Sequence, residues 1–261
     1  MALFAPSPLK RIADWTTRAS PPPLPSGEVH LWRIAVPDAD RIPPYWLGLL
    51  APEEQARVAR KRIPQDARRV LTSRACLRLL LGRYLDLPPA SVAIAVSVNG
   101  KPHLAAPPAS PRLEFNVSHS GDWVVLAFAC GLPLGVDVEC HRELEFSELV
   151  NAFFSPPERE TWSKLPSADH THAFFSAWTR KEAYLKGLGL GLLKPLDSFS
   201  LALGFDPAAE LLWCASDAAA PQRWLIASVD LAPGYACALA VGSAATALHT
   251  FTFDTSATHG G

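Results

Sequence analysis

Asp137 and Glu139 are the side chains whose spacing first points to chemistry. They stand in the segment GVDVE, which follows an apolar run and is typical of a strand. Side chains alternate between the two faces of a strand, so both acids project from one face, ~6.5–7 Å apart. Two such carboxylates repel each other unless a cation lies between them, and Mg²⁺ suits hard oxygen ligands of this kind. An exposed strand face, with each acid paired to Lys or Arg, explains the motif equally well.

A third acid stands in WTRKEAYLKG (178–187), a segment with helical periodicity. The periodicity places Lys181, Glu182 and Lys186 on one side, and the glycines at 187, 189 and 191 end the helix. Glu182 could therefore supply a third carboxylate to a metal, and the two lysines could neutralise phosphates. Glu182 and Lys186 also form a common solvent-side i,i+4 pair, worth only ~0.2–0.5 kcal/mol.

The segment FNVSHSGD predicts a tight turn before a strand. Its backbone N–H groups, the hydroxyls of Ser118 and Ser120 and the imidazole of His119 could donate hydrogen bonds to phosphate oxygens. A Ser–His dipeptide does not by itself form a nucleophile–base pair, because side chains adjacent in sequence seldom face each other.

Further positive charge precedes these motifs. Arg57 and Arg60 lie one turn apart in a predicted helix, and Lys101 lies at the turn NGKP. These side chains could face an anionic ligand, although helices commonly carry solvated arginines.

The pattern of elements predicts two α+β subdomains joined near residues 131–135. The strand, helix and strand signals that support this division are at 29–36, 52–84, 91–97 and 123–129 in the first half, and at 136–139, 156–165, 170–186, 198–203, 223–229 and 235–241 in the second. Segments 123–129 and 136–139 are expected to form a hairpin. The predicted divisions are an irregular Pro-rich leader (1–27), an N-terminal half (28–133), a C-terminal half that carries the acids (134–241) and a fraying tail (242–261).

Composition excludes several classes of protein. The chain has 261 residues, a net charge of -1 and 49% hydrophobic residues, so neither a mainly disordered chain nor a polybasic nucleic-acid binder is expected. Its five cysteines include no C-x-x-C pair, which argues against a disulfide framework and a structural zinc site. The N-terminus lacks a signal-peptide pattern, and the longest apolar run is broken by Gly and Pro. We therefore expect a soluble cytoplasmic protein that binds neither nucleic acid nor membrane.

Together the motifs resemble those of a known family. The segments KP (101–102), FNVSHSGDWVVLAFA, GVDVE, FFSPPERE (153–160) and WTRKEAYLKGLGLGL occur in the order and spacing of the Sfp-type 4'-phosphopantetheinyl transferases. The likeness runs from about Pro52 to Leu201. It implies an α+β fold of two similar α/β halves, related by a pseudo-twofold axis in one chain, with coenzyme A bound between them. Because one chain holds both halves of the cleft, we expect a monomer.

The resemblance also implies roles for individual residues. The family moves phosphopantetheine from coenzyme A to a serine of an apo acyl or peptidyl carrier protein and releases adenosine 3',5'-bisphosphate. Asp137, Glu139 and Glu182 correspond to its magnesium-binding acids, with Mn²⁺ as an alternative ion. Glu182 would accept the serine proton, and Lys186 would stabilise the leaving group or orient Glu182. The predicted coenzyme contacts are Arg57, Arg60, Lys101, Asn116, Ser118, His119, Lys181 and Lys186.

The sequence departs from the family at Glu54 and Val70, where some members carry a Lys and a hydroxyl residue for the 3'-phosphate. Two other functions stay open at this point. One is a metal-independent hydrolase that uses Ser118 or Ser120, a histidine and Asp137, although the sequence lacks a G-x-S-x-G elbow. The other is a catalytically silent module that binds a carrier domain. The sequence does not choose between fatty-acid, polyketide, peptide and siderophore carriers.

Overall fold

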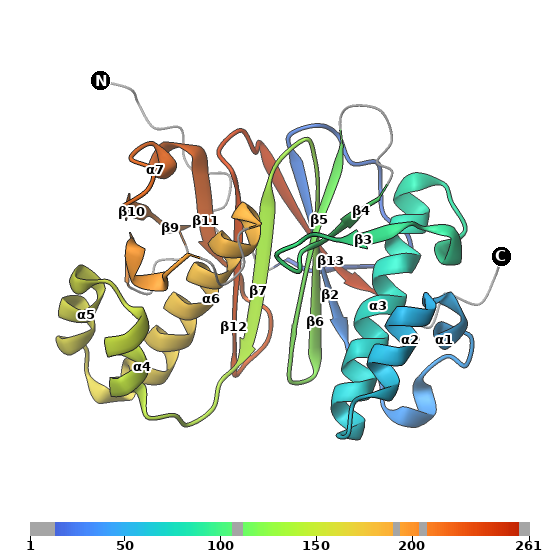
Figure 1. Cartoon of the computed structure of the whole chain (residues 1–261), viewed down its shortest axis with the longest axis horizontal. Coiled ribbons are helices and arrows are strands. Elements are labelled where there is room, and N and C mark those ends of the chain that lie inside the picture. Colours follow the sequence, from blue (N-terminus) through green and yellow to red (C-terminus); the bar gives the residue numbers. More distant parts are fainter. Residues whose placement is uncertain (1–13, 106–111, 190–193, 204–207, 256–261) are drawn as a thin grey trace.

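Two β-sheets lie back to back, and each carries a long helix on its outer face (Figure 1). The computed structural model describes residues 14–105, 112–189, 194–203 and 208–255. Within these residues the layers run helix, sheet, sheet, helix. The α+β class and the arrangement of one sheet and one long helix in each half confirm the fold that the sequence predicts.

The first half is built on a five-stranded sheet with the strand order β1-β13-β2-β6-β5. Its strands and the β3–β4 hairpin beside it are β1 (Thr16–Arg18), β2 (Glu28–Ala35), β3 (Ile94–Val96), β4 (Pro102–Leu104), β5 (Leu113–Ser120), β6 (Trp123–Cys130) and β13 (Ala247–Phe253). Its helices are α1 (Trp46–Leu49), α2 (Pro52–Ala59) and α3 (Pro64–Leu85). The inner side chains of α3, such as Leu77 and Leu80, pack on Trp32 and Phe128 of the sheet.

The second half is built on a four-stranded sheet with the strand order β7-β12-β11-β9. Its strands are β7 (Leu134–Cys140), β8 (Phe199–Leu201), β9 (Ala208–Ala209), β10 (Leu211–Cys214), β11 (Trp224–Ser228) and β12 (Tyr235–Gly242), of which β8 and β10 form a separate pair. Its helices are α4 (Phe146–Phe153), α5 (Pro156–Ser163), α6 (His170–Leu188) and α7 (Ala220–Arg223). The helix α6 crosses β7 and β12, and it ends at Gly189, whose positive φ of 70° suits a residue without Cβ.

Apolar side chains fill the space between the sheets. Val125 and Ala127 of β6 meet Val136 and Val138 of β7 and Leu239 of β12, all essentially inaccessible to solvent. On β7 the valines therefore face the other sheet, and the alternate residues face α6. This alternation turns Asp137 and Glu139 toward α6.

Three predictions about connectivity are wrong. The strands β6 and β7 do not form a hairpin, because β6 pairs with β2 and β5 while β7 pairs with β12. The segment FNVSHS is not a turn: it belongs to β5, and the turn follows at Gly121 and Asp122. The tail also returns to the first half, where β13 pairs in parallel with β1 and β2.

The predicted helical region 52–84 is two helices. Pro64 at the first position of α3 separates it from α2, since proline lacks the N–H that a continuous helix needs. The leader also contains β1, so it is not wholly irregular. In the described ranges, no helix has the length and apolar character needed to cross a bilayer.

Candidate active site

A cavity of about 600 Å³ lies where the two halves meet. We call it the acid pocket. It is lined by Ser73, Arg74, Asn99, Gly100, Lys101, Pro102, Asn116, Val117, Ser118, His119, Asp137, Glu139, Trp178, Glu182, Leu185, Lys186 and Gly189. The first half contributes α3, β4 and β5 to its walls, and the second half contributes β7 and α6. All three acids singled out in the sequence line this one cavity.

The close approach of α6 to β7 brings the third acid to the other two. A Cβ added to Gly135 would lie 2.1 Å from the carbonyl oxygen of Ala183 and 2.3 Å from the nitrogen of Gly187. Only glycine therefore fits at the start of GVDVE. Since Glu182 and Lys186 precede Ala183 and Gly187 by one residue each, this contact sets both beside the acids of β7.

Polar side chains of β5 join the two sheets at the pocket wall. Within the described residues, β5 and β7 are edge strands, and side chains of β5 accept hydrogen bonds from the backbone of β7. The three bonds are Val136 N to Asn116 Oδ1 (2.9 Å), Val138 N to Ser118 Oγ (3.3 Å) and Cys140 N to Ser120 Oγ (3.0 Å). We call these three bonds the ladder. They satisfy N–H groups that an edge strand would otherwise leave open.

Asp137 is the most enclosed of the three acids, at 4% exposure. Its Oδ1 accepts hydrogen bonds from Ser118 Oγ at 2.9 Å and from Lys186 Nζ at 2.6 Å. The Lys186 ammonium also donates to Ser118 Oγ at 3.0 Å. Lys186 thus pairs with Asp137, and not with Glu182 as the helical spacing would allow.

The other two acids are held in an environment that disfavours charge. Burial, and then the negative charge of Asp137, raises the pKa of Glu139, although a hydrogen bond from Ser120 opposes the change. Burial and the charge of Asp137 likewise raise the pKa of Glu182, against the opposing effect of Lys186. A nearby cation would stabilise the charged form of both carboxylates.

Besides Asn116, Ser118 and Lys186, two further predicted coenzyme contacts line the pocket, Lys101 and His119. Lys101 Nζ donates to the carbonyl oxygens of Leu134 at 3.1 Å and Gly187 at 3.4 Å, and burial lowers its pKa. The His119 side chain is exposed at the mouth of the pocket. Loss of hydration in the pocket wall, with further contributions from neighbouring cations, nevertheless lowers its pKa to about 4, so the ring is neutral at pH 7.

Lys181 does not contact a phosphate from its position, and this prediction is wrong. Its side chain has no exposed surface and forms an ion pair with Glu158 at 2.8 Å. The ammonium also donates to the carbonyl oxygens of Leu196 at 2.8 Å and Phe199 at 2.9 Å, so its three donors all have acceptors. Glu158 belongs to the motif FFSPPERE. That motif and Lys181 therefore anchor α5 and β8 to α6 instead of binding a ligand.

Arg57, Arg60 and Glu54 also lie outside the pocket wall. The two arginines are exposed on α2 and at its end. Glu54 accepts a hydrogen bond from the backbone of Ala51 at 3.0 Å and pairs with Arg78 at 2.6 Å. Glu54 therefore caps the N-terminus of α2 and links this helix to α3. These two contacts explain why an acid stands at this position, and no ligand is needed to account for it.

Arg74 is a pocket residue that the sequence interpretation missed. It lies on α3 one turn after Val70, on the wall facing His119. Burial lowers its pKa, and Glu54, which raises it, is itself engaged by Arg78. Continuing the helical periodicity from Val70 by four residues would have found it.

The oxygen ligands of the three acids are of the chemical kind that a divalent cation takes. Oδ2 of Asp137 is buried without a hydrogen-bond partner among the described residues. Burial, and then the negative charge of Asp137, raises the pKa of Glu139 and of Glu182, and a bound cation would oppose both effects. As the side chains stand, no three His, Cys, Asp or Glu residues of the described ranges are grouped closely enough to hold a metal. Lys186 supplies the positive charge at Asp137.

Two family models match adjacent stretches of the chain. A family model described as "4'-phosphopantetheinyl transferase, N-terminal" matches residues 44–131, and the model of the 4'-phosphopantetheinyl transferase superfamily matches residues 133–240. The two matches meet where the chain crosses from the first sheet to the second. Each match therefore falls within one half of the fold.

Individual relatives extend the match. The chain is 36% identical to the 4'-phosphopantetheinyl transferase HetI of a Nostoc species over 68% of its own length and 75% of the relative. It is 32% identical to the 4'-phosphopantetheinyl transferase Sfp of Bacillus subtilis over 62% of its length and 70% of the relative. A solved holo-acyl-carrier-protein synthase from Thermotoga maritima covers 42% of this chain and 62% of its own, at 16% identity and a TM-score of 0.30, too distant to carry weight. The chain belongs to the 4'-phosphopantetheinyl transferase family, as its motifs predict.

Proposed function

We propose that this protein transfers the 4'-phosphopantetheine group of coenzyme A to a serine of an apo carrier protein. The serine oxygen forms a bond to the β-phosphorus, the bond from that phosphorus to the bridging oxygen breaks, and adenosine 3',5'-bisphosphate leaves. The observation that carries the proposal is one cavity in which three acids meet Lys186, Lys101 and Arg74. A pyrophosphate needs both kinds of group: cations for its oxygens and acids that can bind a metal.

The cations of the pocket would hold the coenzyme. Phosphoryl transfer asks mainly for positioning and charge neutralisation, with little covalent chemistry from the protein. Arg74 on one wall and Lys186 on the other approach the cavity from different halves. A diphosphate between them would be clamped across the junction, while the neutral ring of His119 could still donate one hydrogen bond.

Asp137, Glu139 and Glu182 would hold Mg²⁺, or Mn²⁺ in its place. Bound there, the ion supplies positive charge to the pyrophosphate oxygens. Asp137 offers its unpartnered Oδ2, and the raised pKa values of Glu139 and Glu182 favour the arrival of a cation.

Glu182 is the candidate proton acceptor. It comes from α6, opposite the acids of β7, and no hydrogen-bond partner of its carboxylate is found among the described residues. A general base works best when its pKa lies near the working pH, and burial moves the pKa of Glu182 in that direction. Glu182 would take the proton of the carrier serine directly or through a water molecule.

The hydrolase alternative has little support from the geometry. Ser118 is 7% exposed, and its hydroxyl donates to Asp137 itself and not to a histidine. Ser120 likewise donates to Glu139. Neither serine has the activating base that a hydrolytic nucleophile needs.

We further propose that the protein acts as a cytoplasmic monomer on acyl or peptidyl carrier proteins. Both walls of the pocket come from one chain, and all five cysteines are free thiols, as expected in a reducing compartment. The chain's near-neutral net charge gives no reason to expect a nucleic-acid partner.

The test is a transfer assay read by intact mass. The protein, coenzyme A, Mg²⁺ and an apo carrier protein should yield a carrier heavier by one phosphopantetheine, EDTA should abolish the gain, and added Mg²⁺ should restore it. Glu182→Gln should lower the rate by roughly 10²–10⁴-fold, the range typical of a general base. Glu160→Gln is the matched control, because Glu160 lies on the exposed face of α5 with Lys164 as its partner.

A wild-type protein that binds the carrier but adds no mass would support the silent binding module instead. If Glu182→Gln keeps most of the wild-type rate, Glu182 is not the proton acceptor.

A further inference from the structure

The ladder between β5 and β7 does more than close two sheet edges. Its acceptors are alternate residues of β5, and its donors are alternate N–H groups of β7, with each rung joining residue i to residue i+20. The strands therefore run side by side in the same direction. Small polar side chains take the place of a backbone ladder.

Two of the three rungs carry a second hydrogen bond. Ser118 accepts from the N–H of Val138 and donates to Asp137 Oδ1 at 2.9 Å. Ser120 accepts from the N–H of Cys140 and donates to Glu139 Oε2 at 3.0 Å. Each serine thus binds the N–H of one residue and the carboxylate of the residue before it. These two bonds fix the carboxylate of the acid relative to the backbone of β7.

The third rung shows what the ladder looks like without an acid. Asn116 Oδ1 accepts from the N–H of Val136, and the preceding residue is Gly135, which has no side chain to hold. Asn116 is 3% exposed and serves the sheet edge. The difference between the rungs follows the positions of the acids.

The hydrogen-bond capacity of Ser118 is fully used. Its proton goes to Asp137, and its oxygen accepts from Val138 N and from Lys186 Nζ. A hydroxyl has one donor and two acceptor sites, so a phosphate could reach Ser118 only by displacing one of these partners. A direct contact with the coenzyme is therefore less favourable than a role through Asp137.

We propose that Ser118 and Ser120 are positioning residues that orient Asp137 and Glu139 for a divalent cation, whereas Asn116 closes the sheet edge alone. The inference rests on the proposed function, because it assumes that these acids bind the ion. Partners that orient metal ligands typically change metal affinity by roughly 10–100-fold when they are removed. The serine hydroxyls would act at the junction of the two halves, so the same bonds that join the sheets would set the geometry of the site.

The experiment measures Mn²⁺ binding to the full chain by the electron paramagnetic resonance signal of the free ion, without carrier protein. Ser118→Ala and Ser120→Ala should each weaken Mn²⁺ binding by roughly tenfold or more. Ser120→Thr, which keeps the hydroxyl, should stay within about threefold of wild type. In the transfer assay the alanine variants should regain most of the wild-type kcat at saturating Mn²⁺, with an unchanged KM for coenzyme A.

Ser228→Ala is the matched control. Ser228 is a strand serine of the second half whose hydroxyl accepts from Arg180 Nε at 3.0 Å, away from the acid pocket. Its loss should lower stability without changing Mn²⁺ affinity. Ser120 is less buried than Ser118, so Ser120→Ala and Ser120→Thr decide the test if Ser118→Ala fails to fold.

The outcomes separate the inference from the proposed function. If the wild-type protein binds no Mn²⁺, the metal site itself is wrong and the positioning role falls with it. If the wild-type protein binds Mn²⁺ and the alanine variants bind it equally well, the positioning role alone is overturned. A loss of kcat that saturating Mn²⁺ does not restore would also overturn it, because that result indicates direct contact with the substrate.

Discussion

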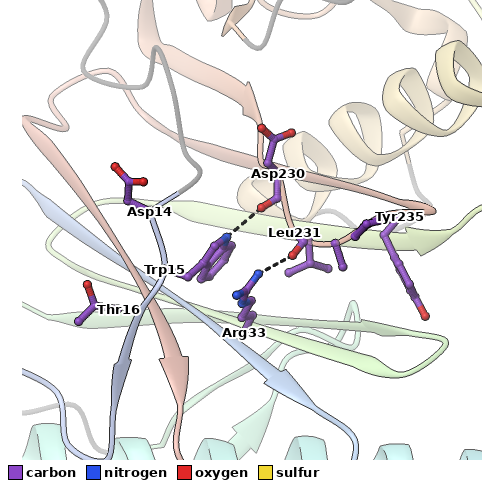
Figure 2. Close-up of a pocket in the computed structure, with 9 residues that line it drawn as sticks. Asp14, Trp15, Thr16, Arg33, Asp230, Leu231 and Tyr235 are labelled. Carbon is purple, nitrogen blue, oxygen red and sulfur yellow. Dashed lines mark hydrogen bonds between the residues drawn. The ribbon is translucent and has the colours of Figure 1, made fainter.

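Two cavities lie where the halves meet: the acid pocket of about 600 Å³, and a groove of about 750 Å³ beside β1 and β2 (Figure 2). We call the second one the tryptophan groove; it is lined by Asp14, Trp15, Thr16, Arg33, Asp230, Leu231, Ala232, Pro233 and Tyr235. Both contain a cation and acids. They differ in how far the protein itself satisfies those charges.

In the tryptophan groove the cation already has its partners. Arg33 donates to Leu231 O at 2.6 Å and to Thr252 Oγ1 at 3.0 Å, and its guanidinium lies 4.6 Å from the centroid of the Trp15 ring. Trp15 in turn donates to the carbonyl oxygen of Asp230 at 2.8 Å, and Figure 2 shows both side chains reaching across the groove. These bonds join the two halves and engage the guanidinium and the indole within the protein.

The acid pocket differs because its polar groups are less fully engaged by the protein. Oδ2 of Asp137 is buried without a partner in the described part of the chain, and the pKa values of Glu139 and Glu182 are raised. Contacts in the tryptophan groove thus fasten the halves, while the acid pocket keeps one buried carboxylate oxygen, Oδ2 of Asp137, without a partner among the described residues. Perturbed carboxylates favour the acid pocket, and not the tryptophan groove, as the candidate functional site.

The sharpest test of this contrast exchanges one cation in each cavity for methionine. Lys186→Met should lower transfer by roughly 10²–10³-fold, because it removes the cation that pairs with Asp137 and that, in the proposed function, neutralises the reacting phosphate. Arg33→Met should lower the unfolding temperature and leave kcat nearly unchanged, since Arg33 bridges the halves. Transfer assays and thermal unfolding of both variants provide the measurement. Equal losses of activity in the two would remove the distinction between the cavities.

The next largest effect should come from the contact that assembles the acid pocket. Gly135→Ala places a Cβ 2.1 Å from Ala183 O, so α6 must move away from β7. A misplacement of about 1 Å costs roughly 100-fold in rate, and overpacking costs about 1–3 kcal/mol of stability. Gly48→Ala is the control, because a Cβ at Gly48 meets no atom within 4 Å. A Gly135→Ala protein with wild-type transfer would show that the spacing of α6 and β7 is not critical.

Local pattern made part of this site predictable from sequence. Strand alternation sets Asp137 and Glu139 on one face, and helical periodicity brings Glu182 and Lys186 together; both relations span at most four residues. These placements needed no knowledge of the tertiary structure.

The missed features depend on contacts between distant segments. Lys181 neighbours Glu182 in sequence, but its role is decided by Glu158, on another helix. The pairing of β13 with β2 joins residues about two hundred positions apart, and no periodicity reveals it. From sequence alone, the serines of β5 are predicted to donate hydrogen bonds to phosphate. The structure shows that they instead accept hydrogen bonds from the edge strand β7.

A smaller effect is expected at Arg74, the pocket cation on α3. Arg74→Ala should raise the KM for coenzyme A about tenfold or more, in line with about 1.5–3 kcal/mol for a hydrogen bond to a charged group, and leave kcat nearly unchanged. Arg57→Ala is the matched control: Arg57 lies near enough to lower the pKa of Arg74 but is exposed outside the pocket wall. Saturation curves for both variants separate the two arginines. A KM that rises only in Arg57→Ala would place the coenzyme over α2 instead.

The smallest expected effect concerns the charge of His119. The pKa of its ring is lowered to about 4, first by lost hydration and then by the positive charges of Arg69, Lys186 and Arg74, which outweigh the contribution of a backbone hydrogen bond. Between pH 5.5 and 8 the ring of the free protein should therefore stay neutral, and only acidification toward pH 4 should charge it. The profile of kcat/KM against pH reports groups of the free enzyme, so wild type and His119→Asn should give curves of the same shape in this window. An inflection near the ordinary histidine pKa of about 6.5 that disappears in His119→Asn would mean that an imidazolium contributes to the acid pocket. The pocket would then rely on a titrating cation, unlike the tryptophan groove, whose arginine is charged at every pH tested.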